Sequence, residues 1–123
     1  MNQYLHRYEK FVAKFAGHEE VVHRMAGMFL SDAPQRLEQI STASELRDWE
    51  GVMSAAHSLV NIAGTMQAFE AAEQARKLEA AVRARAYHEI PELTDRLDQH
   101  LQNALQVLKD YQQNGHYCCT ESV

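Results

Sequence analysis

Apolar side chains recur every three or four residues along most of this 123-residue chain, and that spacing constrains the fold more than any other feature. A period of this kind places apolar side chains on one stripe of an α-helix, whereas a half-buried strand alternates them. Only five glycines and two prolines interrupt the pattern, too few for a sheet protein with many tight turns. The sequence therefore predicts an all-α protein.

Breaks in the apolar pattern divide the chain into five expected helices. Asp48 is a suitable N-cap for the third helix, and Pro91 is tolerated in the first turn of the fifth. Pro34 falls inside the second helix and should kink it. The segment 42–47 is expected to be a loop. The expected helices cover residues 3–15, 19–41, 49–66, 69–85 and 91–114.

Short connections between amphipathic helices favour an up-down four-helix bundle, with the short first helix as an addition that covers one end. Leu59 and Leu101 are expected in its core. The sequence has no repeat, low-complexity tract or long linker. We therefore expect one helical bundle domain over residues 1–114 and a flexible C-terminal tail over residues 115–123.

Composition narrows the classes of partner. The formal net charge of −5 argues against a nucleic-acid binder, whose binding surface is normally basic. No apolar run approaches the roughly 18–20 residues of a membrane span, and the N-terminal residues lack the layout of a secretory signal. Cys118 and Cys119 are adjacent, a poor arrangement for a disulfide framework. These features predict a cytoplasmic protein without nucleic-acid or membrane partners.

His57 is the histidine whose position suggests chemistry. On a helical wheel it lies on the flank of the apolar stripe of its helix, so its base should be part-buried and its tip open. Its neighbours one or two turns away on the same face are mostly small or slender and would leave room for a second protein. A boundary histidine that merely packs is the alternative on this pattern alone. The neighbours are Met53, Ser54, Asn61 and Gly64.

The residues around His57 resemble those of a known family. The run 48–52 (Asp-Trp-Glu-Gly-Val), followed by 55–59 (Ala-Ala-His-Ser-Leu), is similar to the stretch that leads into the phosphoacceptor of histidine-containing phosphotransfer (HPt) domains. The resemblance covers about residues 4–108. It continues at residues 29–34, 63–64, 68 and 75–79.

The resemblance implies a phosphorelay intermediate that accepts a phosphoryl group on His57 and exchanges it with aspartates of receiver domains in two-component signalling. The partner would be a response-regulator receiver domain, a hybrid sensor histidine kinase or both, bound around Met53, Ser54, Asn61 and Gly64. Mg²⁺ would sit on the receiver, so this chain would need no cofactor or metal of its own. It would be a monomeric phosphocarrier that depends on its partner, not a self-sufficient enzyme.

Three further residues are expected near His57. If the chain reverses near Gln67, hairpin geometry brings Glu79 opposite His57, where it would accept a hydrogen bond and orient the imidazole. The alternative is a solvated surface acid. Arg76 and Arg83 share the helix face of Glu79 and would supply positive charge near the phosphoryl group. Their alternative is a set of weak surface ion pairs.

The sequence also departs from the HPt pattern. The family usually reads His-x-Leu-Lys-Gly, but Val60 and Asn61 occupy the last two positions, and Gln67 replaces a further glycine. The usual lysine places positive charge close to the phosphoryl group. Its loss leaves a second function open, that of an HPt-like interaction module that binds a receiver or kinase without carrying phosphate.

A metal-binding bundle is the third function considered. Glu20 and His23 form a Glu-x-x-His pair on one expected helix, the spacing found in carboxylate-bridged metal sites. Such sites need a second copy of the pair, and the sequence has none. We therefore expect no metal site.

Overall fold

The computed structural model describes residues 2–113, and the regular secondary structure within that range is entirely helical. The predicted all-α class is therefore confirmed for this part of the chain. The predicted tail, residues 115–123, lies outside the described residues. The helices are α1 (Gln3–Ala13), α2 (Glu19–Glu45), α3 (Trp49–Thr65), α4 (Phe69–Arg83), a short 3₁₀ helix (Tyr87–Glu89) and α5 (Ile90–Gln113).

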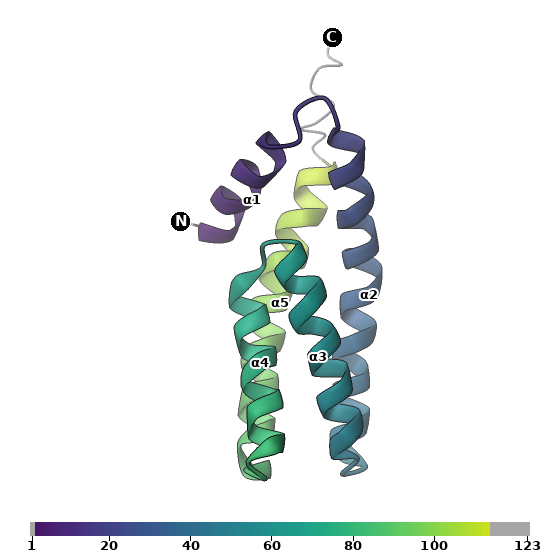
Figure 1. Ribbon diagram of the computed structural model, residues 1–123, viewed down its shortest axis with the longest axis vertical. Coiled ribbons are helices and arrows are strands. Elements are labelled where there is room, and N and C mark those ends of the chain that lie inside the picture. The colour runs from purple at the N-terminus through teal and green to yellow at the C-terminus, as the bar shows by residue number, and fades with distance from the viewer. Residues whose placement is uncertain (1, 114–123) are drawn as a thin grey trace.

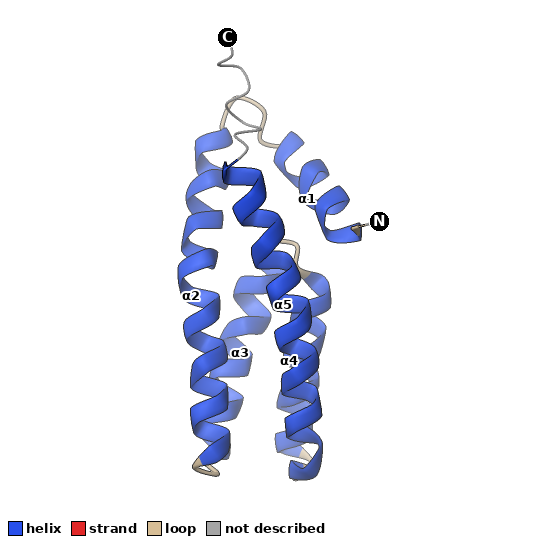
Figure 2. Ribbon diagram, turned by 180° about the vertical axis from the view of Figure 1, so that it is seen from behind, coloured by secondary structure: helices blue, strands red, loops and turns tan. Residues whose placement is uncertain are grey.

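Four of the helices lie side by side along the long axis of the molecule (Figure 1). α3 packs against both α2 and α4, and α5 packs against both α4 and α2, so the four helices enclose one core. α1 stands outside this group, to one side of α5, as the view from behind also shows (Figure 2). No helix in the described range is both long enough and apolar enough to cross a membrane.

The core is built from one apolar stripe of each long helix. Leu59 and Leu101, predicted as core residues, are both completely buried, as are Leu78, Leu97 and Leu108. Alanines occupy many of the remaining core positions, and their small side chains let neighbouring helices approach closely. Those that are fully buried are Ala26, Ala33, Ala56, Ala63 and Ala75.

The second helix extends further than the sequence predicts. The loop expected over residues 42–47 is wrong, because α2 continues to Glu45. Ile40 and Ala43 are buried on the core, and this packing overrides the weak helix propensity of the surrounding serines and threonine. The predicted N-cap of α3 is confirmed, since Asp48 Oδ1 accepts a hydrogen bond from the Gly51 amide at 3.1 Å.

Three helices end in the same way, with a residue that has a positive φ. Arg47 follows α2 with φ 58°, Gln67 follows α3 with φ 66°, and Arg85 follows α4 with φ 57°. The next amide in each case donates to a carbonyl five residues back, at 2.8 Å, which closes the helix and reverses the chain. Glycine is the usual residue at such a position, so each turn carries some backbone strain.

Candidate functional site around His57

The centre of the site is a hydrogen bond between two helices. Nδ1 of His57 on α3 lies 2.9 Å from Oε2 of Glu79 on α4. The two side chains differ sharply in exposure, 65% for His57 and 10% for Glu79. The buried position excludes the alternative that Glu79 is a solvated surface acid. Because Nδ1 is hydrogen-bonded to Glu79, the opposite ring nitrogen, Nε2, is the one that faces solvent.

The local sequence explains why these side chains meet. His57 follows the fully buried Ala56, and a step of about 100° around α3 moves it to the edge of the core. Glu79 follows the fully buried Leu78 in the same way on α4. The short turn between Thr65 and Phe69 sends α4 back along α3 and brings the two edges together. A buried carboxylate without a partner is costly, so the His57 ring also stabilises the position of Glu79.

This arrangement prepares the ring for nucleophilic chemistry. A carboxylate that accepts a hydrogen bond from Nδ1–H favours the neutral tautomer in which the Nε2 lone pair is free. It also fixes the plane of the ring. The result is an exposed nucleophilic nitrogen whose orientation is set by a buried anion.

The residues predicted to contact a partner surround His57 on the outer face of α3. Ser54 and Asn61 are exposed, while Met53 and Gly64 are half-buried. A Cβ atom added to Gly64 would meet no atom within 4 Å, so the surface beside it is open. The approach to His57 is therefore bordered by low side chains, as the sequence indicates.

The two predicted cations are exposed on α4. With His57 opposite Glu79 on the antiparallel helix, Arg76 lies level with Val60, and Arg83 lies level with Met53. The Arg76 guanidinium donates to Glu73 at 2.9 Å, within its own helix. This is a solvated ion pair of the kind that contributes little stability, so it leaves Arg76 able to change partners. Their place near a phosphoryl group stays a prediction.

A groove on the other side of His57 was not predicted from the sequence. It runs between α2 and α3, has a volume of about 630 Å³, and ends at Ser54, one turn from His57. Five of its eleven lining residues are polar residues of α2, including Gln35 and Gln39. Small residues at positions 51, 54 and 55 are the sequence signal that α3 leaves room on this flank.

Metal ligation finds no support in the described part of the chain. Among residues 2–113, no three His, Cys, Asp or Glu side chains gather as the ligands of an ion would. Cys118 and Cys119 lie outside this range.

Comparison with known proteins decides the family. A family model described as the Hpt domain matches residues 24–110. The chain belongs to this family. The match contains α3, α4 and His57, together with most of α2 and α5, and leaves α1 outside. Searches of curated proteins and of solved structures found no match. Membership in the Hpt family implies histidine phosphotransfer in phosphorelay signalling.

Proposed function

We propose that this HPt protein is a phosphorelay intermediate that carries the phosphoryl group on His57. One observation carries the proposal, namely that an exposed imidazole is held through Nδ1 by the buried carboxylate of Glu79 at 2.9 Å. A histidine that only packs would not need this anchored nitrogen and open ring. We assign His57 as the phosphoacceptor and Glu79 as the residue that orients the imidazole.

The transfer follows from the geometry. The Nε2 lone pair attacks the phosphorus of an aspartyl phosphate, the new N–P bond forms, and the P–O bond to the aspartate breaks. The released electron pair stays on the aspartate, which becomes a carboxylate. The imidazole gains positive charge as the N–P bond forms, and the Glu79 carboxylate stabilises that charge. Return of the group to another aspartate reverses these steps.

The partner supplies the rest of the chemistry. Phosphoryl transfer depends on positioning and on neutralising the charge of the equatorial oxygens. A receiver domain carries the aspartate and the Mg²⁺, so this chain needs only a nucleophile and a surface that admits the receiver. We propose Met53, Ser54, Asn61 and Gly64 as that surface. We propose Arg76 and Arg83 as the cations that offset the charge of the phosphoryl group.

The wider proposal places this site on a single cytoplasmic domain. We propose one helical bundle domain over residues 1–114, in which α2–α5 form an up-down four-helix bundle and α1 is an additional short helix. The molecule acts as a monomer and exchanges phosphate with a response-regulator receiver, a hybrid sensor histidine kinase or both.

An HPt-like interaction module is the second candidate, and Val60 is the observation that favours it. The family pattern has a lysine there, and this chain has a half-buried aliphatic residue. Such a module would bind a receiver or kinase without accepting phosphate on His57.

Incubation with phosphorylated receiver domains separates the two candidates. The phosphocarrier gains an acid-labile, base-stable phosphate, both from receivers and from a small donor such as phosphoramidate. Binding to a phosphorylated receiver without any such phosphate would instead establish the interaction module. Substituting His57→Gln in the same assay identifies the accepting residue.

A further inference from the structure

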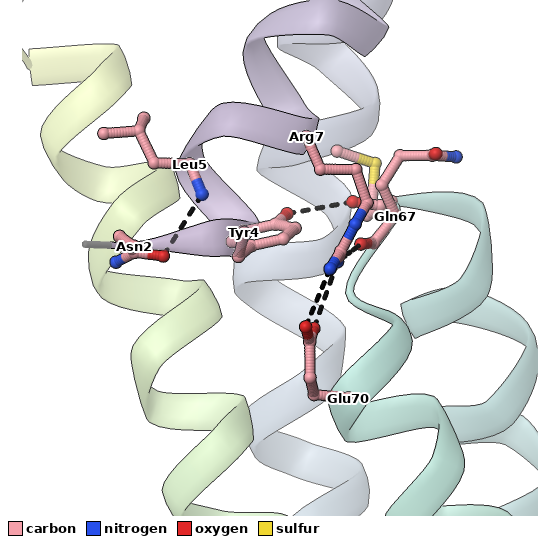
Figure 3. Close-up of polar contacts among 7 residues, drawn as sticks. Asn2, Tyr4, Leu5, Arg7, Gln67 and Glu70 are labelled. Carbon is pink, nitrogen blue, oxygen red and sulfur yellow. Dashed lines mark hydrogen bonds and ion pairs between the residues drawn. The ribbon is translucent and has the colours of Figure 1, made fainter.

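α1 lies outside the part of the chain that matches the Hpt family, yet two of its side chains bind the turn between α3 and α4 (Figure 3). The Tyr4 hydroxyl donates to the Met66 carbonyl at 2.9 Å, and both residues are buried. Arg7 donates through Nη1 to the Gln67 carbonyl at 2.7 Å. Two consecutive carbonyls of the turn are therefore held from a helix more than fifty residues earlier in the sequence.

A fork-to-fork ion pair fixes Arg7 in place. Its two terminal nitrogens contact the two carboxylate oxygens of Glu70, at 3.0 and 2.7 Å. This pairing raises the pKa of Arg7 and lowers that of Glu70, so both groups are charged at neutral pH. The guanidinium also lies 4.9 Å from the centre of the Phe69 ring. Arg7 thus connects the middle residue of the turn, Gln67, to the first turn of α4 through one rigid guanidinium group.

The residue held in this way is the strained one. Gln67 has φ 66°, a conformation that costs a residue with a Cβ atom free energy but costs glycine almost none. The HPt pattern quoted above has a glycine at this position. Arg47 and Arg85 adopt the same conformation, but among residues 2–113 no side chain binds the carbonyl of either. The turn that joins the two helices of the site is the one that receives external support.

We propose that Tyr4 and Arg7 are positioning residues for phosphotransfer, because they clamp the left-handed turn at Gln67 and so fix the register of α3 against α4. The inference rests on the proposed function of His57. α1 supplies from outside what a glycine would supply within the turn. Without the clamp, the turn relaxes and the two helices shift along each other.

The His57–Glu79 pair is sensitive to such a shift. His57 lies about 12 Å along α3 from Thr65, and Glu79 about 15 Å along α4 from Phe69, at the usual rise per residue. Each helix is stiff over that length, so a displacement at the turn is transmitted to the pair. A hydrogen bond of 2.9 Å is lost once its atoms separate by roughly half an ångström. A small shift in register therefore breaks the His57–Glu79 hydrogen bond while both helices stay folded.

The test is a double-mutant cycle between Arg7→Ala and Gln67→Gly, read in two ways. We expect Arg7→Ala to slow transfer from a receiver roughly two- to tenfold and Gln67→Gly to restore most of the rate in the double variant. The ¹⁵N signals of the His57 ring should move away from the Nδ1–H tautomer in Arg7→Ala and return in the double variant. Tyr4→Phe removes one hydroxyl from a well-packed ring and should act in the same direction with a smaller effect.

Asn103→Ala is the matched control. It removes the hydrogen bond from Asn2 to Asn103 at 3.1 Å, which joins α1 to α5 and does not reach the turn. It should leave both the rate and the His57 signals unchanged. Additive effects in the cycle, or unchanged His57 signals in Arg7→Ala, would overturn the clamp. If the wild-type protein accepts no phosphate, the proposed function fails, while the ¹⁵N signals still decide the clamp separately.

Discussion

The two flanks of His57 are built in opposite ways. On the α4 flank, the ring contacts a buried carboxylate, and the neighbouring Met53 and Val60 are half-buried against the core. On the α2 flank, Ser54 is exposed and opens into a groove of about 630 Å³ lined by polar side chains such as Gln39. This comparison leads us to predict that the α4 side sets the reactivity of the ring and that the α2 side contributes to binding a partner.

The sequences of the two neighbouring helices account for the difference. α4 places the small, buried Ala72 and Ala75 toward the interior, which lets α3 and α4 approach closely enough for a direct side-chain hydrogen bond. α2 presents longer polar side chains at the corresponding edge, with Gln35 and Gln39 on the groove. The α4 flank therefore provides a direct side-chain contact and the α2 flank an open groove, so we expect substitutions on the two flanks to affect different steps of the transfer.

Substituting His57→Gln should have the largest effect, because it removes the imidazole that we propose as the phosphoryl acceptor. We expect complete loss of the acid-labile, base-stable phosphate. The free energy of unfolding should stay within roughly 0.5 kcal/mol of wild type, since the side chain is 65% exposed and the glutamine amide can still donate to Glu79. Phosphate assays and thermal unfolding on the same samples measure both effects. A phosphate that persists in this variant would show that another residue is the acceptor.

Shortening core side chains beneath the two flanks should have the next largest effect, and that effect should be on stability. Leu59→Ala and Leu101→Ala each leave a cavity at a completely buried position and should cost roughly 2–5 kcal/mol of unfolding free energy. Denaturant unfolding measures the change. Leu46→Ala is the control, because Leu46 is 74% exposed and should change stability by less than about 0.5 kcal/mol. If all three variants unfold alike, the helical phase described here is wrong.

Truncation on the α4 flank should impair the chemistry itself. Glu79→Ala removes the partner of Nδ1 and should slow phosphorylation about ten- to a hundredfold, by analogy with the loss of carboxylates that orient metal-binding histidines. Glu79→Gln keeps an acceptor oxygen without the charge, so its loss should be several times smaller. The rate of phosphorylation by phosphoramidate measures the effect of each variant on His57 reactivity, without any contribution from receiver docking. Equal rates for the alanine and glutamine variants would show that orientation by Glu79 is unimportant.

Blocking the α2 flank should impair transfer from a receiver but spare the reaction with a small phosphate donor. Ser54→Trp fills the end of the groove one turn from His57, and transfer from a receiver should fall by about tenfold, mainly through weaker binding. Phosphorylation by phosphoramidate should be retained, because the small donor needs little of this surface. Comparing the two donors on one variant separates docking from chemistry. Slower reaction with both donors to the same degree would break the division between the flanks.

Sequence reasoning reached the α4 flank but missed other parts of the molecule, and the reasons are physical. The His57–Glu79 contact follows from two helical periods and one turn, which are local signals. The groove depends on how α2 packs, and the contact of Arg7 with Glu70 joins residues 63 positions apart, so neither leaves a local pattern. The end of α2 was misplaced for a related reason, since burial of Ala43 outweighed the poor helix propensity around it.

Introducing the lysine of the HPt pattern at Val60 should have the smallest effect, because solvent screens the charge that it adds. Val60 is half-buried on the α4 flank, so Val60→Lys must extend its amine outward past the core edge, at a modest cost in stability. A charge-assisted contact to phosphate is worth about 1.5–3 kcal/mol before screening, and solvent at this exposed site will reduce it severalfold. We therefore expect phosphorylation by a receiver to be only a few times faster.

Arg76 could already supply the positive charge that Val60→Lys would add near the phosphoryl group. It lies level with Val60, and the loss of its contact with Glu73 costs little, so we predict that it replaces the lysine. Arg76→Ala should slow transfer a few-fold, and Val60→Lys should restore the rate in the double variant. Arg83→Ala, one turn beyond His57, should have the weaker effect of the two arginines. If none of these three substitutions changes the transfer rate, no cation on the α4 flank assists the phosphoryl group, and the flank acts through Glu79 alone.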